Sequence, residues 1–231
     1  MKHGLNFLIL MLGALSVSVQ ADEIYGTFNF TRLPPHAAVV YIPDQNAPER
    51  IAHVDQKNIE FTKTLDVGTA GTKVIFSNSD QHIHNLFASN YKSDTKFDVG
   101  LIPPGKEVQI PVTWPEDTLL RVGCNIHSNM RTYIANIQSS NFTLVDFVTN
   151  KKKKSRYDDG GYKRKKAAKK LKTSTGKYKF KLYDVSAAAD TVNILLPHYD
   201  LIEIKLSKGE SKSVPLMRRG KQKGELTVSR S

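Results

Sequence analysis

The chain of 231 residues is poor in several residue types and patterns, and each absence excludes a class of protein. A single cysteine, Cys124, excludes an intrachain disulfide. After the first 20 residues, no run approaches the roughly 20 apolar residues that a membrane helix needs. No glycine-rich phosphate loop follows a predicted strand, and no Ser/His/Asp set or paired carboxylates stand out. We therefore expect a protein that is not an enzyme.

The N-terminus has the pattern of a secretory signal peptide. Lys2 and His3 precede an apolar stretch over residues 5–19, which ends in the small residue Ala21. We expect residues 1–21 to be removed and the mature chain to begin near Asp22. Such a chain is periplasmic in a Gram-negative cell. A retained N-terminal anchor is the alternative reading of the same stretch.

Charge divides the mature chain into three parts. Residues 22–150 hold 10 Lys/Arg and 14 Asp/Glu, a net charge of −4. Residues 151–172 hold 12 Lys/Arg and 2 Asp, a net charge of +10, and residues 173–231 carry a net charge of +5. The high positive charge of residues 151–172 predicts a basic linker over residues 147–172. It is either a solvated spacer or a site for an anionic membrane surface or an acidic protein. Export makes nucleic acid an unexpected partner.

The acidic part reads as all-β. Short runs rich in β-branched and aromatic residues alternate with Pro- and Gly-containing turns, which predicts an antiparallel sandwich. The predicted strands are Val39–Ile42, Lys73–Phe76, Glu107–Val112, Leu119–Val122 and Tyr133–Ile137.

A short loop between two of these strands carries three possible metal ligands. The spacing Cys124-x2-His127-x2-Met130 places a thiolate, an imidazole and a thioether close together. With one more histidine, these groups form the ligand set of a blue-copper electron-transfer site. Residues 79–87, which contain His82 and His84, are the candidate source of that histidine.

The sequence resembles the cupredoxins, with the loop spacing of amicyanin. It resembles most the exported bacterial cupredoxins that are often labelled methylamine-utilisation-like. The resemblance covers about residues 24–146 and is carried by Val54–Asn58, Phe76–Asp80, His84–Phe87, Phe97–Gly100 and Gly123–His127. It implies an eight-stranded Greek-key sandwich that binds one type 1 copper ion and passes single electrons. The ligands that the resemblance implies are His84, Cys124, His127 and Met130. It also implies that Asn85 forms a hydrogen bond across the site.

Other readings of the same residues stay open at this point. Cys124 is otherwise a buried structural cysteine, and Met130 otherwise packs in the core. His82 is expected on the surface or behind a ligand. Zinc fits the ligand types, but structural zinc usually takes more thiolates or a third histidine. Glu60 is a further possible carboxylate ligand, which Met130 makes unnecessary.

The last sixty residues predict a small β-sandwich-like module over residues 173–231. Lys177–Tyr183 alternates as a half-buried strand should, and four apolar runs follow it. These runs are Val192–Leu196, Leu201–Leu206, Ser213–Leu216 and Glu225–Val228. The expected organisation is a signal peptide (1–21), a cupredoxin domain (22–146), a basic linker (147–172) and a C-terminal module of structural or docking character (173–231).

Two functions fit these expectations. The first is a one-electron carrier that docks a redox partner protein. The second is a periplasmic protein for copper storage, delivery or sensing without catalytic electron flow. A delivery protein usually has a Met- or His-rich tract, whereas this chain has 4 Met in all, of which Met1 and Met11 lie in the signal stretch. The composition therefore favours the carrier.

Overall fold

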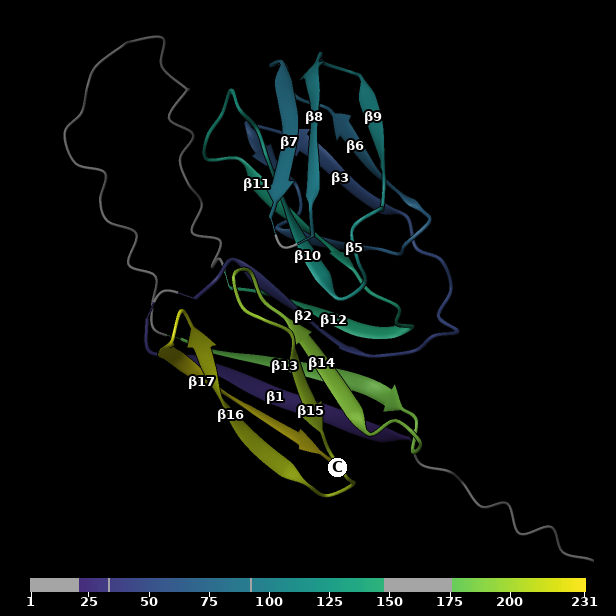
Figure 1. Ribbon diagram of the computed structural model, residues 1–231, viewed down its shortest axis with the longest axis vertical. Coiled ribbons are helices and arrows are strands. Elements are labelled where there is room, and N and C mark those ends of the chain that lie inside the picture. Colours follow the sequence, from purple (N-terminus) through teal and green to yellow (C-terminus); the bar gives the residue numbers. More distant parts are fainter. Residues whose placement is uncertain (1–20, 33, 92, 148–175) are drawn as a thin grey trace, which may run out of the picture.

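The computed structural model describes residues 21–32, 34–91, 93–147 and 176–231. Every regular element among them is a β-strand, as the sequence predicts. No helix in this part of the chain is long and apolar enough to cross a membrane. Nearly all of the expected signal peptide and of the basic linker lies outside the described residues. The strands form two sandwiches, one above the other in Figure 1.

The first sandwich, which we call the central sandwich, consists of β3 to β11. Its five-stranded sheet has the order β5 (Leu65–Gly68), β11 (Arg131–Asn136), β10 (Thr118–Gly123), β7 (His84–Asn90), β8 (Thr95–Ile102). Its four-stranded sheet has the order β4 (Glu60–Phe61), β3 (Ala52–Lys57), β6 (Lys73–Asn78), β9 (Glu107–Pro111). The core between the sheets includes Val54, Phe76, Leu86, Leu120 and Trp114.

The second sandwich, which we call the terminal sandwich, combines strands from both ends of the chain. One sheet has the order β13 (Lys177–Val185), β1 (Asp22–Phe30), β17 (Lys221–Arg230), β16 (Ser211–Arg218). The other has the order β12 (Asn141–Asp146), β2 (Ala37–Ile42), β14 (Thr191–Leu195), β15 (Ile202–Lys205). The strands predicted in the C-terminal module are all present.

This pairing differs from the expected division of the chain into residues 22–146 and 173–231. β1 lies between β13 and β17, and β2 lies between β12 and β14. The physical reason is that both strands carry apolar side chains, and no strand of the central sandwich pairs with β1 or β2 to form a sheet that would bury them. Phe28 and Phe30 of β1 instead pack with Phe180, Leu216 and other residues of the C-terminal strands. The central sandwich is thus inserted between β2 and β12.

A third apolar cluster joins the two sandwiches. It contains Val39 and Tyr41 from β2 together with Tyr133 and Ala135 from β11. The alternate residues of the same strands, such as Val40 and Ile134, face the cores of their own sandwiches. Since successive side chains of a strand point to opposite faces, β2 and β11 are each buried on both sides. The four sheets therefore stack in layers with three apolar interfaces.

Candidate metal centre

The turn between β6 and β7 places His84 at the start of a strand. The Asn78 side chain donates hydrogen bonds to the carbonyls of His82 (2.9 Å) and Ile102 (2.8 Å). Its oxygen accepts the Asp80 N–H at 3.0 Å, which closes an Asx-type turn. His84 follows as the first residue of β7 and is fully buried. Asparagine and aspartate thus shape this turn by bonding to the backbone.

The loop between β10 and β11 carries Cys124, His127 and Met130, and it joins two paired strands, as the sequence predicts. β10 lies beside β7, with Gly123 opposite Phe87, so Cys124 leaves its strand next to the strand of His84. The Met130 N–H donates to the His127 carbonyl at 2.8 Å, which closes the loop before β11 begins. Cys124 and Met130 are each only 2% exposed, whereas His127 is half-buried. The two paired strands thus hold the loop at one end of the central sandwich.

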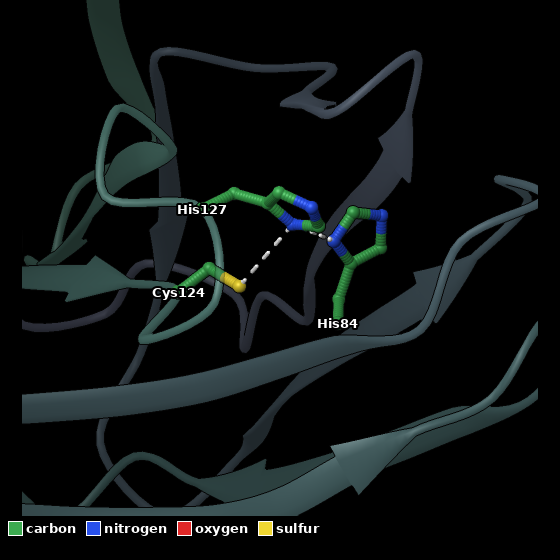
Figure 2. Close-up of side chains that lie close together, drawn as sticks. All are labelled: His84, Cys124 and His127. Atoms are coloured by element: carbon green, nitrogen blue, oxygen red, sulfur yellow. Dashed lines mark hydrogen bonds between the residues drawn. The ribbon is translucent and has the colours of Figure 1, made fainter. Parts of the chain in front are cut away.

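His84, Cys124 and His127 direct their ligand atoms to one point (Figure 2). The two Nδ1 atoms are 3.1 Å apart, and the Cys124 Sγ is 3.9 Å from the His127 Nδ1. All ligand atoms of the three residues lie within 4.8 Å of one another. Two ligands at ordinary bond lengths around one ion are separated by roughly 3 to 4 Å. The donor set and its spacing therefore fit a single metal ion.

Burial keeps His127 in the form that binds a metal. Burial and then the neighbouring His84 and His82 lower the pKa of His127, and Asp80 opposes this only in part. The imidazole is therefore neutral at neutral pH, with a lone pair for a metal.

Asp80 fixes the orientation of His84. Its Oδ2 lies 3.1 Å from the His84 Nε2, so Nε2–H donates to the carboxylate and Nδ1 keeps its lone pair. Burial by itself would raise the pKa of Asp80. Hydrogen bonds from the Ile59 N–H (2.6 Å), His82, His84 and the Gln81 N–H outweigh it and hold this pKa well below its ordinary range. Asp80 therefore stays anionic behind the ligand.

Asn85 links the two ligand-bearing segments, as the resemblance implies. Its backbone N–H donates to the Cys124 Sγ at 3.4 Å, and its side-chain oxygen accepts the Asn125 N–H at 3.3 Å. Its amide group donates to Asp98 at 2.7 Å, and the Asn125 amide donates to the second oxygen of Asp98 at 3.2 Å. The Cys124 sulfur thus accepts a hydrogen bond from a segment that is itself anchored.

Met130 is buried, as Cys124 is. Both residues line a cavity of about 190 Å³, together with Phe87, Arg121, Gly123, Asn125 and Ser128. Glycine is required at position 123, at the end of β10, because a Cβ there would lie 2.9 Å from the Phe87 ring. The structure thus brings the thioether residue and the thiolate residue to one cavity at the end of the loop.

His82 and Glu60 do not join the ligand group. The His82 side chain is about half exposed, and its Nδ1 lies 3.1 Å from Asp80, so it lies behind the ligands. Two contributing residues, Asp80 and Asp98, were not singled out in the sequence. A carboxylate four positions before a candidate histidine is a signal for Asp80. Asp98 lies in a stretch that carries the resemblance, but nothing there indicates its hydrogen bonds.

Solved structures similar to this chain include copper proteins, with low sequence identity. A purple cupredoxin from Nitrosopumilus maritimus is 15% identical, with a TM-score of 0.32, over 37% of this chain and 98% of its own. Amicyanin from Paracoccus versutus is 15% identical, with a TM-score of 0.34, over 47% of this chain and 96% of its own. The Cu-containing nitrite reductase of Thermus scotoductus is 17% identical, with a TM-score of 0.33, over 40% of this chain and 24% of its own. No family model and no curated protein sequence matches the chain.

Proposed function

We propose that this protein is an exported, periplasmic one-electron carrier with one type 1 copper ion held by His84, Cys124, His127 and Met130. The observation that carries the proposal is the convergence of two imidazole Nδ1 atoms and one thiolate sulfur within 4.8 Å. A single thiolate with two imidazoles and a thioether is a set that favours copper over structural zinc. When bound, copper supplies the reversible gain and loss of one electron.

The protein side of this function is a rigid, shielded site. His84 is held by Asp80, and the Cys124 loop is held by Asn85, so the ligands keep their positions. The Cys124 thiolate is shielded from water, because both Cys124 and the neighbouring His84 are buried. The half-buried His127 is the ligand nearest to solvent and therefore the residue through which an electron leaves.

Three exposed aliphatic side chains accompany that exit. Ile83 precedes His84, Ile126 precedes His127, and Leu101 lies opposite Asn85 in the β7–β8 pair. Exposed apolar groups gathered at one end are typical of an interaction surface. They support short-lived docking of a redox partner at the ligand end.

The alternative is storage, delivery or sensing of copper without catalytic electron flow. Exchangeable copper needs ligands that solvent and a recipient can reach, whereas His84 is 0% and Cys124 2% exposed. Burial of these two ligands supports the carrier. Slow copper loss to a chelator together with a reversible voltammetric wave is the expected result. Rapid loss without such a wave would favour delivery.

The test of the metal and its type is an absorption spectrum. Copper-loaded protein should be blue, with an intense thiolate-to-copper absorption band at about 600 nm, as the cupredoxin resemblance implies. Cys124→Ser should remove the band, because the thiolate is the electronically active ligand. His82→Ala is the matched control, because His82 lies outside the ligand group, and it should keep the band. A colourless protein that retains zinc through purification would overturn the proposal.

A further inference from the structure

Six cationic or potentially cationic side chains gather where the two sandwiches meet. We call them the junction cluster. They are His36, Arg121, Arg131, His198, Arg218 and Arg219. The central sandwich supplies two of the four arginines and the terminal sandwich supplies the other two.

The central half of the cluster lies on the face of β10 and β11 that meets the terminal sandwich. Arg121 is the Cα partner of Tyr133, and Arg131 precedes Tyr133 by two residues on the same strand. Both arginines therefore share the face of Tyr133, which belongs to the apolar cluster between the sandwiches. The Tyr133 ring lies 6.0 Å from the His36 ring, which places His36 at the edge of that cluster.

The terminal half is carried by two tight turns. The β14–β15 turn holds His198, with a φ of 70°, between Leu195 and Leu201, which both pack in the cluster between the sandwiches. The β16–β17 hairpin presents Arg218 and Arg219. It turns through Arg219 and Gly220, whose φ values of 51° and 68° match the turn that joins paired strands.

Packing brings the two halves together, because Leu195 and Leu201, which flank His198, belong to the same apolar cluster as Tyr133, whose face Arg121 and Arg131 share. Burial first, and then Arg131, His198 and Arg121, lowers the pKa of His36. Burial first, and then Arg218, Arg121, Arg219 and Arg131, lowers the pKa of His198. Both histidines therefore respond to arginines of the other sandwich. These histidines are neutral at neutral pH, so the four arginines supply the positive charge.

Little negative charge offsets these arginines. Asp146 acts against them at His36, and its carboxylate accepts a hydrogen bond from Thr64 at 3.1 Å. Within the described ranges, no ion pair joins any of the four arginines to a carboxylate. Positive charge concentrated in this way repels itself and attracts an anionic counterpart. An anion that binds to the junction cluster would therefore offset the repulsion among its arginines.

The cluster reaches the candidate metal centre. Arg121 lines the same cavity as Cys124 and Met130, and Arg131 directly follows Met130 in the chain. A partner seated on these arginines lies against the ligand loop. Arg131 and Arg218 are half-buried, so they suit carboxylate side chains that reach in and accept paired N–H bonds.

We propose that the junction cluster is the docking surface for an acidic region of a partner protein. That this partner exchanges electrons rests on the proposed function. The terminal sandwich thereby has a role, since it supplies Arg218, Arg219 and His198 to the surface. Carboxylates of the partner would pair with the arginines, and the ligand loop would lie at the edge of the contact.

The test measures binding of a polyglutamate peptide of about 15 residues to the chain from residue 22 onward, without metal and at low salt. The double variant Arg218→Glu/Arg219→Glu changes the charge by four units. At a few tenths of a kcal/mol for each unit of charge, it should weaken binding about tenfold. Lys177→Glu/Lys179→Glu is the control with the same change in charge. It lies on β13, at the opposite edge of the same sheet from β16, and should change binding less than threefold. Melting curves check that both variants fold.

Amide chemical shifts on titration separate the surface from the basic segment of residues 151–172. Shifts confined to β10, β11 and the two turns support the proposal. Shifts confined to the basic segment, or equal weakening by both double variants, would overturn it. Binding to vesicles with anionic lipid but not to the peptide would overturn the assignment of a protein partner. Because the assay needs no metal, a chain that proves redox-silent yet binds the peptide through these residues refutes the electron carrier and supports the acidic docking surface.

Discussion

At the scale of single residues, the candidate metal centre depends on groups that are not candidate ligands themselves. Asp80 is held anionic by backbone and histidine donors and fixes the tautomer of His84. A negative charge this close to a ligand stabilises the more positive oxidation state of a bound metal. Asp80 should therefore set the reduction potential as well as the geometry.

Asp80→Asn tests this role. The amide oxygen can still accept from the His84 Nε2–H, so copper should be retained, while loss of the charge should raise the potential by on the order of 60 mV. That figure converts about 1.4 kcal/mol, the scale of one charged hydrogen bond, for one electron. Voltammetry measures it. Asp66→Asn, in the same sandwich but paired with Lys63, is the control and should shift the potential much less. Equal shifts in the two variants would contradict the role of Asp80.

Met130 should tune the metal rather than hold it. An axial thioether contributes a weak bond, and His84, Cys124 and His127 already converge without it. Met130→Leu should therefore keep the blue colour and raise the potential, because the remaining surroundings are more apolar. Copper titration and voltammetry measure the two effects. A variant that no longer binds copper would make Met130 an essential ligand.

At the scale of elements, β2 is the strand on which the two sandwiches depend. The Tyr41 hydroxyl donates a short hydrogen bond to Asp117, in the turn before β10. Burial first, and then this bond to Asp117, raises the pKa of Tyr41 far above its ordinary value. The bond thus joins a strand of the terminal sandwich to a turn of the central one.

Tyr41→Phe should lower the free energy of unfolding by about 1 to 3 kcal/mol, because a partly buried carboxylate loses its donor. Chemical denaturation measures the change. Tyr25→Phe is the control, since Tyr25 is 48% exposed on β1, and it should change stability by less than about 0.5 kcal/mol. If the two variants were equally stable, the hydrogen bond would not contribute to the junction.

The elements themselves could be predicted from sequence, whereas their partners could not. Val39–Ile42 and Lys177–Tyr183 were predicted as strands from β-branched runs and alternation, and both are strands. Alternation tells which side chains share a face but not which strand lies alongside. The pairing of β1 with β13 and β17 depends on fitting apolar faces over some 150 to 200 residues of chain. The loop of Cys124, His127 and Met130 could be placed between two strands because these residues are close in sequence, whereas the contacts of Asp80 depend on the fold.

At the scale of the whole molecule, the insertion of one sandwich into the other makes folding a joint event. β1 has both of its neighbours in residues 177–231. The start of β1 and the end of β17 are also tied together, because Asp22 pairs with Arg230 at 2.9 Å, and Asp22 pairs with Lys208 at 2.7 Å. The C-terminal strands are therefore part of the frame that holds the central sandwich.

A chain that ends at residue 172 should consequently not fold cooperatively. Phe28, Phe30 and Val40 would lose the strands that cover them and leave apolar faces in water. Co-expression with residues 173–231 should restore a soluble complex, because the missing strands pair without a covalent link. Calorimetry and size-exclusion chromatography follow both results. A shortened chain with the melting midpoint of the full chain would show that the terminal strands are dispensable.

The basic segment, in contrast, should be dispensable for the fold. The described chain stops at Phe147 and resumes at Gly176. These two ends are close together, because the Tyr178 hydroxyl donates to the Phe147 carbonyl at 3.3 Å. The rings of Tyr178 and Phe147 also lie 4.9 Å apart. A few residues can span that gap. Closing a shorter loop costs less entropy, so replacing residues 149–174 by six Gly/Ser residues should raise stability by about 1 kcal/mol. The blue spectrum should be unchanged, since no ligand lies in the segment.

The charges of that segment should govern association instead. Exposed charges act over about 8 Å at physiological salt, so they change the rate of encounter with an anionic surface more than the metal centre. Neutralising the eight residues Lys151–Lys154 and Lys163–Lys166 in the full chain should slow binding to anionic vesicles and remove its salt dependence, to the same extent as the Gly/Ser replacement. Stopped-flow binding at two salt concentrations measures this. If the neutralised chain bound as fast as the natural one while the shortened chain did not, length rather than charge would be the property that matters.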